Sequence, residues 1–280
     1  MCVTETDRMT DFTFLEPGAE STRAAFLDNG YLIVPAESAS ALNAIRVLVA
    51  ESTAAPLGQD VPKDIDAFLN DFHQQVTIDE LNRVRLSVID GLNNQSWVRA
   101  AYFQLARNTI FSIVGNELAM QRRVNLSIQL PGDQSSILPV HADVWSGDSP
   151  YEIVLWVPLV DCHNTKSMYL MPPGPDRKAQ GNMGQDFKGA SEEDLFETIK
   201  NDVEWMNVPF GNVLVFSQTL MHGNRINEES ETRWSLNCRF KSLFSPYADK
   251  RLGEFFEPIT MRATTEMALA YNLPKGFDDA

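Results

Sequence analysis

The two halves of the chain differ in the spacing of their hydrophobic residues. Up to about residue 120 the apolar positions mostly recur at helical intervals, and from residue 123 onward they fall in short runs typical of β-strands. Helices are predicted over 21–29, 38–55, 65–76, 78–92 and 96–114, with one strand over 31–35. The N-terminal half is therefore predicted to form a layer of supporting helices.

The second half contains several short predicted strands. In the first, 124–130, apolar and polar side chains alternate strictly, which is typical of a strand with two different faces. The others are predicted over 151–160, 168–171, 206–209, 213–217 and 232–244. Many short strands after a block of helices favour a mainly β core with flanking helices, that is, a jelly roll backed by N-terminal α-helices.

We expect a single domain over 1–280. Its first part, 1–120, would supply the helical support layer and the first strand. The second part, 121–245, would form the jelly-roll core, and the last part, 246–280, would form a C-terminal extension. The charged segment 174–205 interrupts the core and is predicted to be a helix-bearing insertion. Long insertions at such a point often act as lids over a site.

Composition limits the classes of partner. The chain has 280 residues, 44% of them apolar, no run long enough to span a membrane, and a formal net charge of -15. This charge argues against nucleic acid and anionic membranes as partners, so we expect a small-molecule ligand, with any anion held by a local cation. The three cysteines, Cys2, Cys162 and Cys238, have no C-x-x-C spacing, and the N-terminus lacks the apolar stretch of a signal peptide. A cytoplasmic location is expected, and no oligomeric state is indicated.

Two of the four histidines have the surroundings of metal ligands, whereas His73 and His163 are interpreted as structural. His141 and Asp143 form His-x-Asp, whose side chains lie on the same side of an extended segment. Such a spacing arises by chance with a probability of about one quarter, so it needs support. His222 supplies it at the end of a predicted buried strand, because two histidines and one carboxylate form the facial ligand set of non-haem Fe(II) sites.

A second alternating strand begins eleven residues after His222. Its polar face carries Arg233, Ser235, Asn237 and Arg239, and its other face Trp234, Leu236, Cys238 and Phe240. A polar face of this kind is usually solvated, but in a barrel it can point inward. An inward Arg233 would bind a carboxylate in a two-pronged manner, with the Ser235 hydroxyl as a further donor.

The order His141-x-Asp143, His222 and Arg233-x-Ser235 resembles that of Fe(II)/2-oxoglutarate dioxygenases in the phytanoyl-CoA dioxygenase-like superfamily. The segment 30–35 after a short helix is similar to the way such chains begin. A looser resemblance, to oxygenases of sporadic carbohydrate-biosynthesis clusters, rests on 140–151 and 156–160. The chain departs from the superfamily at 171–175, which reads Met-Pro-Pro-Gly-Pro where a Pro-Gly-Ser-His element is often found.

The resemblance implies a double-stranded β-helix in which His141, Asp143 and His222 hold Fe(II). It further implies that 2-oxoglutarate chelates the metal and pairs through its C5 carboxylate with Arg233 and Ser235, and that O2 is consumed. The implied reaction is oxidation of a C–H bond in a small polar metabolite, such as a sugar derivative or a natural-product intermediate. Hydroxylation is the commonest outcome, while desaturation, ring formation and epimerisation stay open; halogenation is disfavoured because Asp143 is present.

Four further residues are candidates for ligand contact. Gln129 is predicted to contact 2-oxoglutarate, and Trp145, Asn125 and Arg239 the substrate. For each, an ordinary structural or solvent-facing role remains the alternative. A different class of function also remains open, namely a barrel protein or isomerase that binds a metal or a sugar without redox chemistry.

Overall fold

The computed structural model describes residues 14, 18–60, 62–186 and 191–272. Cys2 and most of the N-terminal segment used to argue against a signal peptide lie outside the described residues. Within the described part, no helix combines the length and the apolar character that crossing a bilayer requires. The elements that position the site lie within these ranges.

The helical first half is confirmed, and two of its predicted helices are divided. The elements are α2 (Ala19–Asn29), β1 (Tyr31–Pro35), α3 (Ala39–Ala54), η1 (Ala55–Leu57), α4 (Ile65–Asn70), η2 (Phe72–Gln74), α5 (Ile78–Asn93), α6 (Val98–Gln104) and α7 (Arg107–Ile113). Local chemistry sets the boundaries: the Ser38 hydroxyl accepts from the backbone N–H of Ala41 at the start of α3. Gly30 ends α2 with φ 74°, a value that favours glycine.

A larger antiparallel sheet forms the centre of the molecule. Its strands are β2 (Leu118–Gln121), β3 (Asn125–Gln129), β4 (Glu152–Pro158), β7 (Asn212–Ser217), β9 (Arg233–Ser242) and β10 (Phe256–Thr260), together with β1. The order is β1-β7-β4-β9-β2-β10, with β3 also beside β9. Strand β9 is the central element, because β4 pairs along one edge and β3 and then β2 along the other.

The smaller sheet has the order β6-β5-β8, with β5 (Tyr169–Leu170), β6 (Glu204–Trp205) and β8 (His222–Gly223). The predicted strand over 206–209 is wrong in its position, because β6 ends at Trp205 and only Val208 forms a bridge, to Cys162. The sequence pattern also missed β2, β8 and β10. The remaining elements are η3 (Asp143–Ser146), η4 (Asn164–Lys166), α8 (Pro173–Asp186), α9 (Glu192–Ile199) and α10 (Ala263–Leu269).

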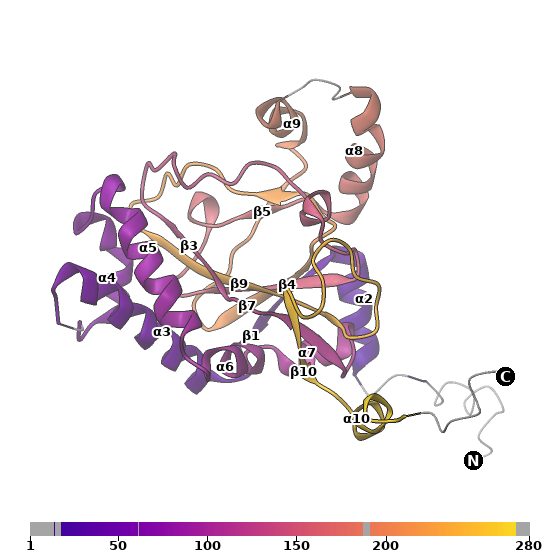
Figure 1. The fold of residues 1–280 in the computed structure, drawn as a ribbon. Coiled ribbons are helices and arrows are strands. Elements are labelled where there is room, and N and C mark those ends of the chain that lie inside the picture. Colours follow the sequence, from indigo (N-terminus) through magenta and orange to yellow (C-terminus); the bar gives the residue numbers. More distant parts are fainter. Residues whose placement is uncertain (1–13, 15–17, 61, 187–190, 273–280) are drawn as a thin grey trace, which may run out of the picture.

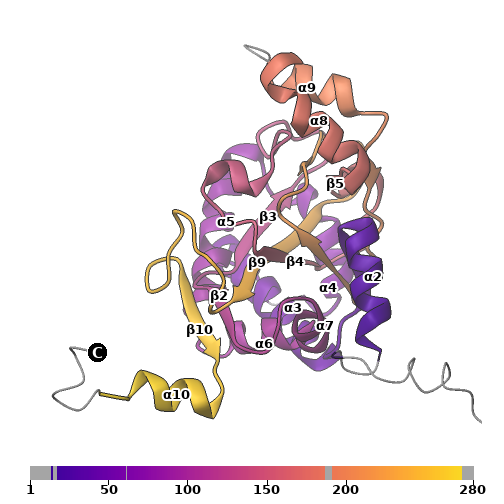
Figure 2. The ribbon, with the colours of Figure 1, turned by 90° about the vertical axis from the view of Figure 1, so that its right-hand side faces the viewer.

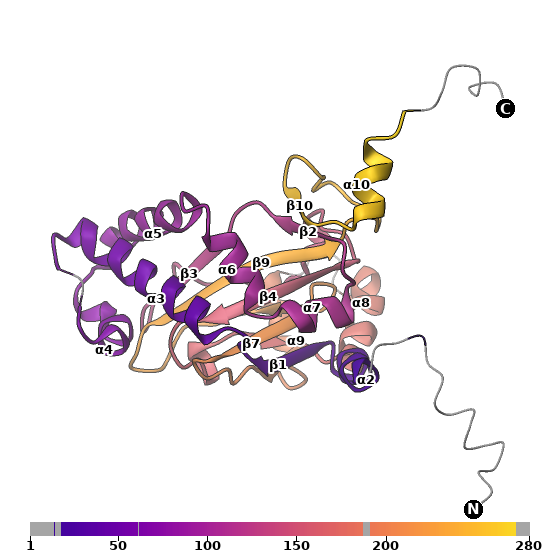
Figure 3. The same ribbon diagram turned by 90° about the horizontal axis from the view of Figure 1, so that it is seen from below.

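The elements are stacked in layers. Figures 1 and 2 show α3, α6 and α7 below the larger sheet, the short strand β5 above it, and α8 and α9 of the insertion at the top. Seen from below, α3, α6 and α7 lie on the near side of the larger sheet, and α4 and α5 lie beyond them at one end (Figure 3). The insertion and this helical layer thus lie on opposite sides of the larger sheet.

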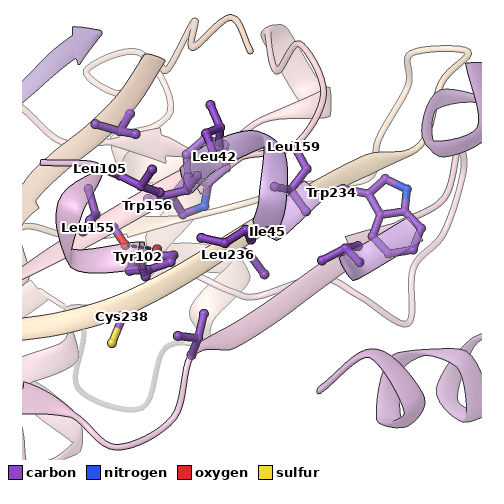
Figure 4. Close-up of a cluster of buried hydrophobic side chains, with 14 of the residues drawn as sticks. Leu42, Ile45, Tyr102, Leu105, Leu155, Trp156, Leu159, Trp234, Leu236 and Cys238 are labelled. Carbon is purple, nitrogen blue, oxygen red and sulfur yellow. Dashed lines mark hydrogen bonds between the residues drawn. The ribbon is translucent and has the colours of Figure 1, made fainter. Parts of the chain in front are cut away.

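The hydrophobic core lies between the helical layer and the larger sheet. Leu42 and Ile45 of α3 pack with Trp156, Leu236 and other strand residues (Figure 4). The Tyr102 hydroxyl donates to the Leu155 carbonyl oxygen at 2.8 Å, so the one polar atom of this buried ring is satisfied. Burying one face of β9 against helices leaves its other face to line an interior space.

Candidate active site

Three potential metal ligands converge above the larger sheet. His141 precedes η3, Asp143 begins it, and His222 lies in β8; one ligand atom from each can be chosen so that all lie within 4.8 Å of one another. The backbones of the two histidines are bonded reciprocally, His141 N–H to His222 O at 3.0 Å and His222 N–H to His141 O at 2.8 Å. The chain itself therefore sets the spacing of the two imidazoles.

Each imidazole is oriented by a backbone carbonyl two residues earlier in the chain. Nδ1 of His141 lies 2.8 Å from the Pro139 oxygen, and Nδ1 of His222 lies 2.8 Å from the Leu220 oxygen. Because a carbonyl oxygen only accepts, Nδ1 carries the proton in both rings, and Nε2 keeps its lone pair. This is the tautomer that ligates a metal through Nε2.

Gly223 allows the two ligand-bearing segments to approach closely. A Cβ at this position would lie 2.8 Å from the Leu138 oxygen, 3.0 Å from the Pro139 oxygen and 2.6 Å from the Tyr169 hydroxyl. Real Cβ atoms do not occupy such space, so a side chain would push the segment before His141 away from β8. The glycine directly after His222 thus maintains the distance between the histidines.

The protonation states of the buried ligands suit a cation. Burial alone would raise the pKa of the Asp143 carboxyl, but His141, His222 and Arg239 outweigh it and hold this pKa well below its usual range. Burial lowers the pKa of His222 to about 4; the nearby His141 adds to the effect and Asp143 opposes it. At neutral pH Asp143 is therefore an anion and His222 a neutral imidazole, as metal ligation requires.

The three ligands line a cavity of about 390 Å³. Its polar wall comes from β3 and β9 through Asn125, Ser127, Arg233, Ser235, Asn237 and Arg239. Its apolar wall comes from Leu138, Val154, Trp156, Met168 and Phe216, and further polar residues are Ser146, Asp148, Asn224 and Lys250. The polar face of β9 therefore points inward.

Arg233 is a buried cation in this cavity. It is 4% exposed, and its Nη1 and Nη2 donate to the Ser167 carbonyl oxygen and the Ser127 hydroxyl, both at 2.9 Å. Its Nε is buried without a hydrogen-bond partner, and within the described ranges no carboxylate lies within ion-pair distance of it. Burial lowers its pKa to about 10, so the guanidinium is still charged at neutral pH. A buried, unpaired cation beside three metal ligands fits an incoming carboxylate.

Ser235 and Asn125 also face the cavity. Ser235 is buried two residues beyond Arg233, and the Asn125 amide donates to the Asn237 side-chain oxygen at 3.0 Å. Ser127 lies directly opposite Ser235 in the β3–β9 register and holds the Arg233 guanidinium. Ser127 lies on the same polar face of the strand as Asn125, and this shared face is the feature of the sequence from which its position in the cavity could have been predicted.

Gln129 and Trp145 are not among the cavity-lining residues. The Gln129 amide is already used, because its Nε2 donates to the Arg225 carbonyl oxygen at 2.7 Å and its Oε1 accepts from Asn224 at 3.3 Å. The Trp145 indole donates to Gln180 of α8 at 3.3 Å and is 41% exposed. In this structure the two residues connect surrounding segments.

Arg239 lines the cavity, but its guanidinium is largely committed to protein groups. Its Nη2 lies 2.9 Å from Oδ1 of Asp143, and its Nε donates to the Gln218 side-chain oxygen at 3.1 Å. Asp148 lies 3.3 Å from the same Nε and also pairs with Lys250. Asp148 and Lys250 carried no signal in the sequence, because a contact between residues about a hundred positions apart leaves no local pattern.

Comparison with known proteins identifies the fold. No protein-family model and no curated protein matches the sequence. Among solved structures, the nickel complex of the non-haem monooxygenase ThoJ has a TM-score of 0.53 at 15% identity, covering 86% of this chain and 84% of ThoJ. The non-haem α-ketoglutarate-dependent carbocyclase SnoK has the same TM-score and identity, covering 86% of this chain and 98% of its own.

A third similar structure, HygX from Streptomyces hygroscopicus, contains nickel and 2-oxoglutarate. It has a TM-score of 0.51 at 15% identity and covers 83% of this chain and 89% of its own. The chain thus has the fold of non-haem enzymes of the iron and 2-oxoglutarate type.

Proposed function

We propose that this chain is an Fe(II)/2-oxoglutarate-dependent oxygenase built on that fold. One observation carries the proposal: a single cavity contains a two-histidine, one-carboxylate ligand set and a buried arginine without a carboxylate partner. The antiparallel sheets and flanking helices support the double-stranded β-helix as the framework. A cytoplasmic location is part of this proposal.

Each group has a distinct task in this proposal. His141, Asp143 and His222 hold Fe(II) and leave positions for a chelating co-substrate and O2. Arg233 and Ser235 bind the C5 carboxylate of 2-oxoglutarate, while Ser127 keeps the guanidinium in place by accepting a hydrogen bond from it. A charge-assisted, two-pronged pair of this kind suits a dianion held inside a protein of net charge -15.

The bound metal and 2-oxoglutarate supply an oxidative decarboxylation with O2, giving succinate, CO2 and one oxygen atom for the substrate. The residues of the chain position the reactants and exclude water. The apolar wall of Val154, Trp156, Met168 and Phe216 restricts solvent beside the ligands. Asn125 and Asn237 present amide groups to the cavity, where they are suited to bind polar ligand atoms.

The proposed reaction is hydroxylation of a C–H bond in a small polar metabolite, such as a sugar derivative or a natural-product intermediate. A cavity of about 390 Å³ accommodates 2-oxoglutarate with a molecule of that class and is too small for a folded macromolecule. The net charge of -15 opposes nucleic acid as a partner. Desaturation, ring formation or epimerisation would use the same ligand set.

Anaerobic titration of the purified protein with Fe(II) and then 2-oxoglutarate tests the proposal. The expected result is a weak visible metal-to-ligand charge-transfer band that is absent in His222→Ala. Arg233→Ala should require much more 2-oxoglutarate to reach the same band. Metal binding without any band in the wild type would favour the alternative class, a non-redox metal-binding barrel.

A further inference from the structure

Three charged side chains form a cluster at the solvent side of the cavity. Asp148 is buried between two cations: Arg239, whose Nε lies 3.3 Å from its Oδ1, and Lys250, whose Nζ is bonded to its Oδ2. The exposed fractions of the side chains increase from 0% for Asp148 through 13% for Arg239 to 25% for Lys250. Lys250 is therefore the most exposed of the three lysine and arginine side chains that line the cavity.

The charges in the cavity do not cancel when the metal and the 2-oxoglutarate of the function proposed above are included, so this inference rests on that function. A divalent metal would be neutralised by Asp143 and the C1 carboxylate of 2-oxoglutarate, and Arg233 by the C5 carboxylate. Among the other charged residues that line the cavity, one anion, Asp148, then remains for two cations, Arg239 and Lys250. The lining of the loaded site therefore keeps an excess of one positive charge, in a protein whose overall charge is strongly negative.

Lys250 is the less committed of the two cations at this end. Arg239 uses Nε on Gln218, Nη1 on Gln121 and Nη2 on Asp143. Among the described residues, the Lys250 ammonium donates one hydrogen bond, to Asp148, and its other neighbour is the Phe255 ring, whose centroid is 4.9 Å away. An ammonium has three donors, so Lys250 retains capacity to bind an anion.

Ser146 is held next to Lys250 by the packing of two loops. The backbone N–H of Lys250 donates to the Gly147 carbonyl oxygen at 3.4 Å, and Ser146 lines the same cavity. Gly147 has φ 85°, and a Cβ there would lie 2.8 Å from the Asp249 carboxylate. The close approach of these loops places two cavity-lining residues, one with a hydroxyl and one with an ammonium group, on adjacent segments.

We propose that Lys250, assisted by Ser146, binds a single anionic group of the substrate, a carboxylate or a phosphate. The substrate class is thereby narrowed from any small polar metabolite to one that carries a negative charge. Charge complementarity with the lining of the loaded cavity is the reason.

Three probes with related carbon skeletons test this proposal: glycerol, glycerate and glycerol 3-phosphate. Each is titrated anaerobically into protein loaded with Fe(II) and 2-oxoglutarate, with calorimetry for binding and the charge-transfer band as evidence that 2-oxoglutarate stays bound. At least one of the anionic probes should bind and glycerol should not. The preferred anion distinguishes a carboxylate substrate from a phosphate substrate. Equal binding of glycerol, or binding of neither anion at millimolar concentrations, would overturn the proposal.

Variants of Lys250 and Ser146 test whether these residues are responsible for anion binding. Lys250→Gln should weaken binding of the preferred anion at least tenfold, Lys250→Arg should restore most of it, and Ser146→Ala should cause a smaller loss. Lys200→Gln is the matched control, because Lys200 is an exposed lysine paired with Glu197 on the insertion. If Lys250→Gln does not fold, Lys250→Arg and Ser146→Ala still carry the test. Unchanged anion affinity in folded Lys250→Gln refutes the proposal, whereas absence of the band in wild type refutes only the oxygenase assignment.

Discussion

Nη2 of Arg239 lies 2.9 Å from Oδ1 of Asp143, so a cation is bonded directly to the carboxylate of the candidate metal site. The guanidinium is itself held by Gln218, whose Nε2 donates to Oε2 of Glu152 at 2.8 Å. Asp143 is therefore restrained by a continuous series of side-chain contacts that extends to a buried glutamate. Groups that orient a metal ligand in this way affect metal affinity without touching the metal.

The first prediction concerns Arg239. In Arg239→Leu, Asp143 loses the partner that orients its carboxylate and lowers its pKa, so Fe(II) affinity should fall by about 10- to 100-fold. Anaerobic calorimetric titration measures the change. Arg122→Leu is the control, because Arg122 is a half-exposed arginine paired with Glu257. Wild-type metal affinity in Arg239→Leu would show that Asp143 is oriented without it.

The second prediction concerns Arg233. Arg233→Ala should raise the apparent KM for 2-oxoglutarate by about 30-fold to several thousand-fold, because removing one partner of a buried charge pair costs about 2 to 5 kcal/mol. The KM of Arg233→Lys should lie between that of the wild type and that of Arg233→Ala, since an ammonium keeps the charge but lacks the planar fork of a guanidinium. Fe(II) affinity should be unchanged in both variants. An unaltered KM would move the C5 carboxylate to another cation.

The third prediction separates the two kinds of histidine. His222→Ala and Asp143→Ala should abolish 2-oxoglutarate-dependent succinate formation, since two protein ligands do not retain the metal in place. His73→Ala should keep it, because His73 bonds to Thr232 at 3.2 Å and is not among the cavity-lining residues. Succinate is measured in the presence of Fe(II), 2-oxoglutarate and O2. Full activity in either ligand variant would contradict the assignment of the metal site.

The fourth prediction is a pH dependence of stability arising from Glu152. Burial raises the pKa of this carboxyl to about 7, Asp148 adds to the effect, and hydrogen bonds from Ser149 and Gln218 and the charge of Lys241 oppose it. Between its ordinary value of 4.5 and about 7 the folded protein keeps the proton while the unfolded chain loses it. Glu152 therefore lowers stability progressively as the pH rises through this range, by about 2 to 3 kcal/mol, and no further above it.

Glu152→Gln removes this titration. The free energy of unfolding of the variant, minus that of the wild type, should increase by about 2 to 3 kcal/mol between pH 5 and pH 8. Urea denaturation at each pH gives the difference, with Glu228→Gln on the exposed surface as the control. A difference that does not change with pH would mean that Glu152 is already ionised at pH 5 in the folded protein.

The fifth prediction concerns the insertion as a lid. Helix α9 is attached to the body through Arg225, which pairs with both oxygens of Glu193 at 2.6 and 2.8 Å and lies over the Phe196 ring at 4.3 Å. Glu193→Ala combined with Phe196→Ala should lower the ratio of oxidised substrate to succinate by about two- to tenfold, because an open site admits water. Fe(II) affinity should stay as in the wild type. A parallel loss of Fe(II) affinity would mean that the insertion supports the metal site.

Alternation along the chain was enough to predict much of the fold. The opposite faces of β9 are sorted as expected, with Trp234 and Leu236 in the core and Arg233 and Asn237 toward the cavity. Alternation does not predict which strands pair. Strand β10 is five residues long and includes Pro258, and it is a strand because it pairs with β2. The two residues of β8 are likewise a strand because Tyr169 and Leu170 lie on one side of them and His141 on the other.

The relative placement of site residues could be predicted only where the residues lie on the same strand. Arg233 and Ser235 are two positions apart on β9, so their shared face follows from the period of the strand. The placement of Gln129 depends on the loop at Asn224 and Arg225, which binds its amide, and nothing in the strand pattern indicates that loop. The contact between Asp148 and Lys250 could not be predicted either, because it depends on the packing of two loops.

The two ends of the cavity are built from different kinds of structure. Arg233, Ser235 and Ser127 lie on strands that are hydrogen-bonded to neighbours, whereas Ser146 ends the short helix η3 and Asp148 and Lys250 lie on connecting segments. Connecting segments accept substitutions and changes of length that a paired strand does not. A lineage carrying this scaffold can therefore change what it recognises by altering 146–150 and 246–253 while inheriting the Arg233 end of the cavity intact. For the same reason, exchanging these two loops is a route by which the specificity of the proposed oxygenase can be redesigned.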